Sequence, residues 1–344
     1  MATSYIGADV DCNTTVLAVR RGGSVVGRYR VPTTIPALCE VLAQIPNPKV
    51  MTFEEGPLAD WLYRNLRDRV TELVVCDPRR NRLIVGDGDK TNPMDAEKLA
   101  ELLQGGHVRP VYHSDRVDRA ELKQWVALYH DRVEEAVRQV NKIRGRCRMH
   151  GVRPVRGFLS NEKARDAWLK GLRPGALAGQ LRVLFLGYQA AAEQVRRCRQ
   201  ELARRSRREA MVRRWQQLPG VGLIRAVTFL AYMDTPWRFG SPKKRWKYCG
   251  VGLERKASGT DARGRDKPGK VRVCRACNRR LKSVVLGATL SAVGQGGNKF
   301  RDVYERLVRK GVSLGNARRA AARKLIDTMT GMWKQGSDFQ PDLA

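Results

Sequence analysis

The sequence predicts an α/β amino-terminal domain, a long helical hairpin or coiled coil, and a mainly α-helical carboxy-terminal domain. Three observations support this. Short segments rich in β-branched residues open the chain, two long runs with helical spacing of apolar residues follow, and apolar helical patterns return after Leu218. A chain of 344 residues is longer than one compact core usually takes. We place the domains at 1–113, 114–210 and 211–335, followed by a tail at 336–344.

The amino-terminal domain is predicted to begin with a meander of three strands, at residues 4–10, 14–20 and 24–31. These segments are short and are separated by polar or Gly-containing turns. Helices and strands then alternate, with a helix at 35–44, a strand at 49–53, a helix at 58–69, a strand at 72–76 and a helix that begins near Pro93. This element order is that of the RNase H-like fold.

The chain carries a large positive charge. Sixty-six Lys and Arg residues stand against 34 Asp and Glu residues, which gives a formal net charge of +32. A compact protein with this excess repels itself unless a polyanion neutralises it, and the planar guanidinium suits phosphates and base edges. We therefore expect nucleic acid as the partner, with a steep salt dependence of binding. An anionic membrane surface is the weaker alternative.

Composition also excludes several classes of protein. Apolar residues make up 42% of the chain, as in folded proteins, and no apolar run is long enough to span a bilayer. The first residues lack a signal-peptide pattern, so we expect a cytoplasmic location and no membrane partner. The eight cysteines are scattered and predict thiols rather than a disulfide framework. Cys274 and Cys277 form a lone C-x-x-C, which is weak evidence for zinc.

Residues 115–210 predict two long helices joined by a turn. Apolar residues recur at helical spacing, with charges between them, on both sides of the break GLRPGALAG. An antiparallel hairpin or a partial coiled coil is the expected arrangement. The arginines around 137–156 and 196–214 allow two interpretations of equal weight, a solvated helix face or a surface that binds nucleic acid or a partner.

The carboxy-terminal segment contains a glycine turn, Pro219-Gly220-Val221-Gly222, before an apolar helix. This pattern resembles a helix-hairpin-helix element, in which backbone N–H groups at Gly220 and Gly222 approach a phosphate. A plain tight turn between helices explains the same residues. From Lys282 to Trp333 the pattern is helical again, and the tail after Gln335 is expected to fray.

Residues 254–282 form a basic, Gly-rich stretch without strong periodicity. They predict a loop that becomes ordered on a phosphate backbone. The residues expected to contact phosphates in this stretch are Arg255, Lys256, Arg263, Arg265, Lys267, Lys270, Arg279 and Arg280.

Three carboxylates are expected to meet at one edge of the predicted sheet. Asp9 ends the first strand, Glu54 ends the fourth, and Asp95 stands at the start of the helix that would pack across both. Metal-assisted phosphodiester chemistry needs carboxylates that converge from separate elements. Two Mg²⁺ ions about 4 Å apart can then hold the attacking and leaving oxygens.

Each acid also has a purely structural interpretation. Asp9 would terminate a strand, as Asp11 would, and Glu54 or Glu55 would simply be exposed. The run Asn92-Pro93-Met94-Asp95 is also a near-ideal helix start, with Asn as the N-cap and Pro at the first helical position.

Several blocks of the sequence resemble a known family. YIGADV, TFEEG, KTNPMDAEKLAELL, LPGVG and CGVGLERKASG are similar, in this order, to the blocks of DEDD-type insertion-sequence transposases and the related Piv-like recombinases. The resemblance runs from about residue 4 to residue 330. It implies a RuvC-like amino-terminal domain, a coiled-coil connection and a transposase domain with a conserved serine. It also implies donor and target DNA, a structured non-coding bridge RNA that specifies both, and a homodimer or homotetramer in a bacterial cell, at the nucleoid when bound to DNA.

Carried over residue by residue, the acids of the family fall on Asp9, Glu54 and Asp95. Glu55 is the alternative to Glu54, because this chain has Glu-Glu-Gly where relatives usually have Glu-x-x-Gly. Relatives carry an aspartate where this chain has Asn92. The carbonyl oxygen of Asn92 still ligates a hard cation, but the site loses one negative charge, so metal affinity should be weaker. The nearby acids at 87 and 89 are candidates to compensate, although both precede Lys90.

The nucleophile of the family falls on Ser258, in Lys256-Ala257-Ser258-Gly259. A lone Ser-Gly is ordinarily a turn, so this assignment depends on the resemblance. The hydroxyl would attack a DNA phosphate and hold it as a phosphoserine, with the acid-bound Mg²⁺ lowering the pKa of the hydroxyl. The active site would then draw on two domains, of one subunit or of two.

The leading hypothesis is therefore a DNA recombinase or transposase with a serine nucleophile. Asn92 favours a second hypothesis, a DNA- or RNA-binding relative that keeps the scaffold and does not cut. A third is a Holliday-junction-type nuclease that cuts with metal-activated water, for which Ser258→Ala would stay active while Asp9→Ala would not.

Overall fold

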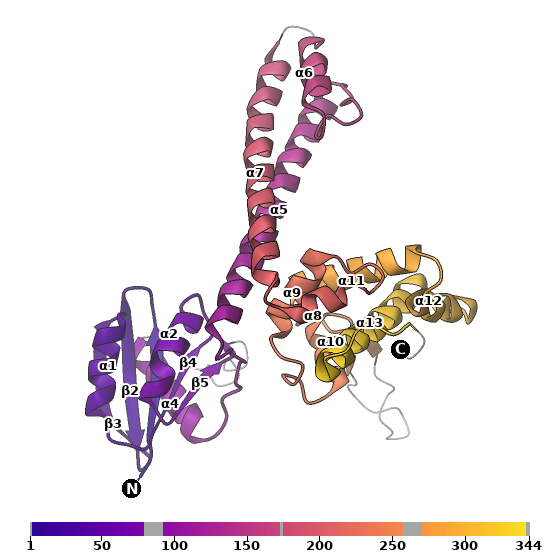
Figure 1. The fold of residues 1–344 in the computed structure, drawn as a ribbon. Coiled ribbons are helices and arrows are strands. Elements are labelled where there is room, and N and C mark those ends of the chain that lie inside the picture. The colour runs from indigo at the N-terminus through magenta and orange to yellow at the C-terminus, as the bar shows by residue number, and fades with distance from the viewer. Residues whose placement is uncertain (1, 79–91, 173–174, 257–269, 342–344) are drawn as a thin grey trace, which may run out of the picture. The chain divides into compact units, whose positions relative to one another are not determined.

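The computed structural model describes residues 2–78, 92–172, 175–256 and 270–341. The chain divides into two compact units, Met1–Val117 and Asp118–Ala344 (Figure 1). The first is a mixed α/β unit. The second is mainly helical, as the sequence predicts. Among the described residues, no helix combines the length and the apolar character needed to cross a bilayer.

The first unit is built on a five-stranded sheet in the order β3-β2-β1-β4-β5. β1 pairs antiparallel with β2 and β2 antiparallel with β3, whereas β1 with β4 and β4 with β5 are parallel. This mixed order is consistent with the expected RNase H-like fold. The strand bounds are β1 Ser4–Val10, β2 Thr14–Arg21, β3 Ser24–Pro32, β4 Lys49–Glu54 and β5 Glu72–Cys76.

Helices cover both faces of this sheet (Figure 1). The helices α1 (Ile35–Gln44) and α2 (Ala59–Leu66) bury one face, where Ile6, Phe53 and Leu62 belong to one apolar cluster. The helix α4 (Asn92–Gln104) packs on β1, β2 and β4, and a second cluster joins its Ala96 to two side chains of β2. The helix predicted at 58–69 is correct up to Leu66, after which Arg67–Arg69 tightens into a 3-10 turn.

The second unit begins with two long helices that run side by side, α5 (Val117–Met149) and α7 (Ala176–Ser206) (Figure 1). Both were predicted. Between them the structure adds a shorter helix, α6 (Glu162–Lys170), whose N-cap Asn161 accepts a hydrogen bond from the Ala164 N–H. An apolar cluster joins these helices, and its buried members are Ile143, Cys147, Phe158, Leu169, Leu177, Leu181 and Phe185.

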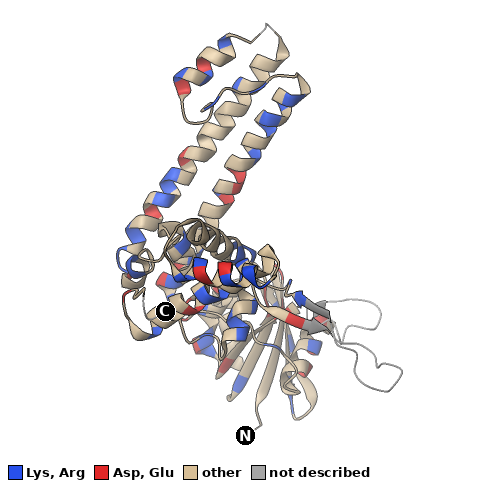
Figure 2. Ribbon diagram, turned by 90° about the vertical axis from the view of Figure 1, so that its right-hand side faces the viewer, with Lys and Arg blue, Asp and Glu red and all other residues tan. Residues whose placement is uncertain are grey.

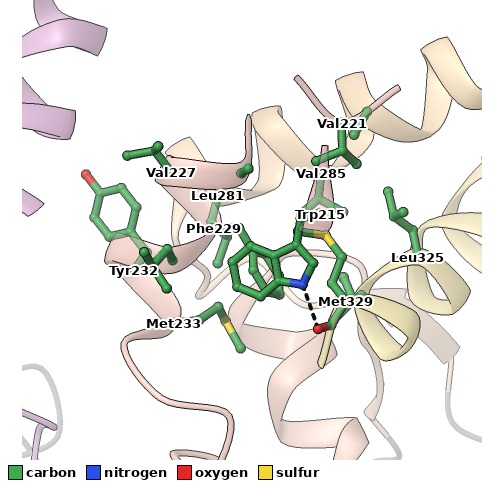
Figure 3. Close-up of a cluster of buried hydrophobic side chains, with 14 of the residues drawn as sticks. Trp215, Val221, Val227, Phe229, Tyr232, Met233, Leu281, Val285, Leu325 and Met329 are labelled. Carbon is green, nitrogen blue, oxygen red and sulfur yellow. Dashed lines mark hydrogen bonds between the residues drawn. The ribbon is translucent and has the colours of Figure 1, made fainter. Parts of the chain in front are cut away.

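The rest of the second unit is a helical bundle around Trp215 (Figure 3). The indole N–H of Trp215 donates to the Met329 carbonyl oxygen at 2.9 Å, and its ring meets Phe229 and Trp333 edge-on. A fully buried indole needs such an acceptor, because an unpaired N–H is costly away from water. The bundle helices are α8 Ala210–Trp215, α9 Leu223–Met233, α10 Pro242–Tyr248, α11 Arg279–Gly294, α12 Lys299–Arg309 and α13 Leu314–Gln335.

Two expectations for the carboxy-terminal part were wrong. Within the predicted loop 254–282, the structure has two antiparallel strands, β6 (Leu253–Lys256) and β7 (Lys270–Val273), and α11 already begins at Arg279. Strands of four residues are too short to give a clear alternating pattern in the sequence. The tail does not fray at Gln335 either, because the Phe339 N–H donates to Gln217 Oε1 at 2.8 Å.

Candidate functional site

The strands place Asp9 and Glu54 side by side on one face of the sheet. Ala8 pairs with Phe53 across β1 and β4, and Asp9 and Glu54 each follow that pair by one residue. Successive side chains of a strand point to opposite faces. Ala8 and Phe53 are buried in the cluster under α1 and α2, so the two acids lie on the face that α4 covers.

The helix α4 brings a third acid to this face. Asp95 stands in its first turn, directly before Ala96, which packs on β1 and β2. The pKa of the Asp9 carboxyl is raised above its usual value, first by burial and then by the negative charges of Asp95, Glu54 and Asp11. The described residues therefore form an acidic cluster of Asp9, Glu54 and Asp95, in which the charges of Asp95 and Glu54 disfavour the ionised form of Asp9.

Glu55 has a different environment from Glu54. Its Oε2 lies 2.7 Å from the Nε2 of His113, a side chain that is only 4% exposed. The His113 ring also packs on Tyr63, with 5.2 Å between ring centroids, and its Nδ1 lies 3.9 Å from Asp60 Oδ1. No short motif in the sequence pointed to His113. Glu55 is thus held by His113, and Glu54 is the glutamate whose charge acts on Asp9.

The chemistry of the acidic cluster suits a hard divalent cation. Carboxylate oxygens are the preferred ligands of Mg²⁺, and a cation would offset both the burial of the Asp9 charge and its repulsion by Asp95 and Glu54. Across the described residues, however, no three Asp, Glu, His or Cys side chains are already close enough together to hold an ion. The carboxylates would have to draw together on binding. Asn92 is the first residue of α4, and the acids at 87 and 89 lie outside the described residues.

The expected nucleophile lies outside the described residues. Ser258, Arg263, Arg265 and Lys267 all fall within 257–269. The two strands on either side are described, and Lys256 pairs with Lys270 across the β6–β7 hairpin. The backbone of Arg255 belongs to the same hairpin, opposite Val271.

The glycine turn has a structural role in the bundle. Gly220 has a φ of 75°, and a Cβ at this position would lie 2.3 Å from the Ala288 carbonyl oxygen of α11. Glycine is therefore required both by the backbone conformation and by the close approach of α11. Gly222 precedes α9 as its N-cap, with open space around it. The Gly220 carbonyl accepts a hydrogen bond from Arg225 Nη1 at 2.5 Å.

The neighbouring arginines at the start of α11 differ in their contacts. Arg279 is exposed. Arg280 forms an ion pair with Asp131 of α5 and donates a hydrogen bond to the Tyr232 hydroxyl at 3.1 Å. Arg280 thus links α11 to α5 and α9 within the second unit. This structural role is independent of a contact with phosphate.

Many arginines of the long helices have acidic partners on the same helix. Lys and Arg recur along α5 and α7, with Asp and Glu between them (Figure 2). Arg196 and Arg197 both pair with Glu193 at 2.7 Å, and their hydrogen bonds lower the pKa of that carboxyl to about 2. Arg204 and Arg205 surround Glu201 in the same way. These pairs agree with the solvated-face interpretation for this part of α7.

Comparisons with known proteins show which transposases this chain is similar to. A profile described as "Transposase" of the DEDD IS110 type matches residues 6–147, which include the acidic cluster. A second, described as "Transposase IS116/IS110/IS902 family", matches residues 212–305, which include Ser258. A protein of Sinorhizobium fredii named "Putative transposase y4qE" is 26% identical over 234 residues. That match covers 68% of this chain and 56% of the relative, so the chain spans little more than half the relative's length. Two separate parts of the chain are thus similar, in order along its sequence, to transposase models of the IS110 type.

Proposed function

We propose that this protein is a DNA recombinase that cleaves and rejoins strands of a mobile element through the hydroxyl of Ser258. The observation that carries the proposal is the acidic cluster. Asp9, Glu54 and Asp95 come from two strands and a helix and share one face of the sheet, and burial together with the charges of Asp95 and Glu54 raises the pKa of Asp9. Carboxylates that repel one another in this way are a typical arrangement of sites that act on phosphates with a cation.

The serine would perform the covalent step. The Oγ of Ser258 loses its proton and forms a bond to a DNA phosphorus, while the bond from that phosphorus to a deoxyribose oxygen breaks and the released oxygen takes up a proton. The phosphoserine keeps the energy of the phosphodiester, so a hydroxyl of another strand can attack it and restore Ser258. No external energy source is needed for rejoining.

The acidic cluster would bind the cation that this chemistry requires. Asp9, Glu54 and Asp95 would hold Mg²⁺, with Asn92 as a neutral ligand, in a one- or two-metal arrangement. When bound, the cation would supply positive charge that stabilises the oxyanions of the transferring phosphate. Asp9 must be ionised for this role, so the rise in its pKa sets a lower pH limit for cation binding.

Donor and target DNA are the proposed substrates, and a structured non-coding RNA is the proposed guide. The net charge of +32 supports a large polyanionic partner such as DNA or RNA. Cleavage at two DNA sites at once would need at least two serines, which is the reason to propose a homodimer or homotetramer.

The test is the formation of a covalent protein–DNA adduct. The full-length protein would be incubated with Mg²⁺, DNA that carries the ends of the element encoding this chain, and RNA transcribed from the non-coding DNA beside the gene. Denaturing electrophoresis would show an adduct for the wild type and none for Ser258→Ala or Asp9→Asn. Omission of the RNA would also abolish the adduct.

The same experiment separates the two other candidate functions. Asn92, in place of the acid that relatives carry, favours a binding protein without activity. Such a protein would bind the DNA with neither adduct nor nicks, and Asn92→Asp would be needed to gain them. A nuclease that uses water would nick DNA without an adduct, and Ser258→Ala would remain active.

A further inference from the structure

One tryptophan of the second unit is exposed to solvent without an apolar neighbourhood. Trp237 has 69% of its surface exposed, whereas the other six tryptophans are buried or half-buried. All seven belong to the described residues. Exposing an indole is unfavourable, because its large apolar rings lose contact with a core. The exposed indole of Trp237 therefore keeps ring surface that is free to stack on another flat ring.

The segment that carries Trp237 is held firmly between α9 and α10. Arg238 donates from Nη1 to the Tyr232 carbonyl oxygen at 2.6 Å, and its guanidinium lies over the Phe239 and Tyr248 rings, 5.1 and 4.5 Å from their centroids. The backbone N–H of Trp237 donates a hydrogen bond to Thr235 Oγ1 at 3.2 Å. These contacts fix the backbone on both sides of the indole, so little entropy is lost when a ligand binds to the ring.

The next helix is held so that its lysines face away from the bundle. In α10, Arg245 is buried and pairs with Asp327 of α13 at 2.6 Å, and the indole N–H of Trp246 donates to the same carboxylate at 3.0 Å. Lys243, Lys244 and Lys247 are exposed on the same helix. The exposed ring thus belongs to a segment of fourteen residues, Thr235 to Tyr248, that contains basic residues and no acid.

A further cation lies directly at the indole. The Nζ of Lys334, near the end of α13, is 4.4 Å from the centroid of the Trp237 ring. A cation over one face of an indole is a favourable contact, and it brings positive charge next to whatever covers the ring. The surroundings of Trp237 are therefore aromatic and cationic, without further exposed apolar side chains on the same loop or on α10.

We propose that Trp237 is a stacking platform for an unpaired base of a single-stranded nucleic acid. The lysines Lys243, Lys244, Lys247 and Lys334 would contact the phosphates on either side of that base. Stacking on an aromatic side chain within a basic groove is how proteins bind single strands without regard to sequence. Contiguous exposed apolar patches mark many binding sites for protein partners, and the described surface on the Trp237 loop and on α10 has no further exposed large apolar side chain.

This inference rests on the proposed function only in taking nucleic acid as the ligand. It does not depend on Ser258 or on the acidic cluster. Base stacking at Trp237 would serve a reaction in which DNA strands separate, or in which RNA loops are recognised, because only unpaired bases offer a free ring face.

The test uses fluorescence titrations of the full-length protein with a twelve-residue oligothymidylate, the matching oligouridylate and a fully paired duplex. Stacking on Trp237 would quench tryptophan emission of the wild type with a single strand. Trp237→Phe would keep the affinity, because phenylalanine also stacks, and would lose most of the quenching. Trp237→Ala would weaken single-strand binding about tenfold, within the usual range for one stacked base, and leave duplex binding unchanged.

Leu290→Ala removes another exposed apolar side chain of the same unit, 54% exposed, and is the matched control. It should leave both affinity and quenching unchanged, and circular dichroism should show that every variant is folded. If Trp237→Ala weakens binding of the oligothymidylate, the stacked base comes from DNA. If it weakens binding of the oligouridylate, the base comes from RNA. Equal single-strand affinity of Trp237→Ala and wild type, or an equal loss for single strand and duplex, would overturn the proposal. If stacking holds while Ser258 forms no adduct, only the proposed function fails.

Discussion

Gly7 of β1 lies so close to Ala96 of α4 that a Cβ on the glycine would be 2.1 Å from the Ala96 carbonyl oxygen. The same Cβ would be 2.4 Å from the backbone N of Ala100. Backbone atoms of a helix cannot move aside independently, so the absence of a side chain at position 7 allows α4 to lie directly on the strand. This contact places Asp95, one residue before Ala96, over the end of β1, where Asp9 lies.

Gly7→Ala should therefore destabilise the first unit by about 2 kcal/mol or more, since the added methyl forces α4 away from the sheet. Chemical denaturation followed by circular dichroism measures this. Gly56→Ala is the control, because a Cβ there meets nothing within 4 Å. Equal stability of the two variants would show that α4 does not need the close contact.

Asp9→Asn should raise the thermal stability of the cation-free protein at neutral pH. The folded state raises the pKa of Asp9 above 3.8, so stability contributed by this group is present below that value and is lost as the pH rises through the raised pKa. Asparagine at position 9 removes the cost of burying this charge and its repulsion by Asp95 and Glu54.

We expect a rise in Tm of about 2 °C at pH 7 and no difference near pH 3. Scanning calorimetry in the presence of a chelator measures both. Asp11→Asn is the comparison, since Asp11 makes the smallest contribution to the shift and should give a smaller rise. A lower Tm for Asp9→Asn at pH 7 would contradict this account, because it would mean that the ionised carboxylate stabilises the folded state.

The adjacent arginines of α11 should separate stability from nucleic-acid binding. Arg280→Ala should cost about 1 kcal/mol, because it removes the ion pair with Asp131 and the hydrogen bond to Tyr232. Arg279→Ala should leave stability unchanged and reduce the salt slope of DNA binding by about one. Urea denaturation and DNA titrations at several salt concentrations measure the two effects. If Arg279→Ala lost stability while Arg280→Ala changed only the salt slope, the division of roles between the two arginines would be refuted.

The second unit should become more stable as the pH rises, because the buried amine of Lys299 then loses its proton. Its Nζ is buried without a hydrogen-bond partner among the described residues, and burial together with Lys324 lowers the pKa of this amine to about 8. Between that value and its usual 10.5, the unfolded chain holds the proton more tightly, so stability rises as the pH rises through this window.

Lys299→Met keeps the aliphatic stem and removes the charge. We expect a Tm about 2 °C above wild type at pH 7, with the difference lost near pH 10.5. Lys310→Met, at an exposed lysine of the pocket between α12 and α13, should change the Tm little at either pH. A destabilised Lys299→Met at pH 7 would show that the ammonium contacts at 5.5 Å to Phe300 and 4.4 Å to Phe339 outweigh the cost of burial.

Local pattern was sufficient for the strands of the first unit and for the long helices. The predicted strand at 4–10 coincides with β1, because β-branched residues between polar turns mark a strand without any tertiary information. The placement of Asp9 and Glu54 at strand ends followed from the same pattern. Their role as metal ligands stays a prediction.

Contacts between distant residues could not be predicted. The choice between Glu54 and Glu55 depends on strand alternation and on His113, which is 58 positions away from Glu55. The ion pair of Arg280, which was expected to contact phosphate, joins it to Asp131 at a separation of 149 positions. Gly7 looked like any strand glycine, since nothing in YIGADV shows that a helix would lie on it. The β6–β7 hairpin was missed because its pairing joins residues on either side of a long basic segment.

Cation binding by the full-length protein tests the acidic cluster most directly. Mn²⁺ would be titrated into the wild type and into Asp9→Asn, Glu54→Gln and Glu55→Gln, with the free ion measured by electron paramagnetic resonance. We predict that wild type and Glu55→Gln bind Mn²⁺ alike, whereas Asp9→Asn and Glu54→Gln weaken binding at least tenfold. Unchanged binding by Glu54→Gln, together with a loss in Glu55→Gln, would contradict the account.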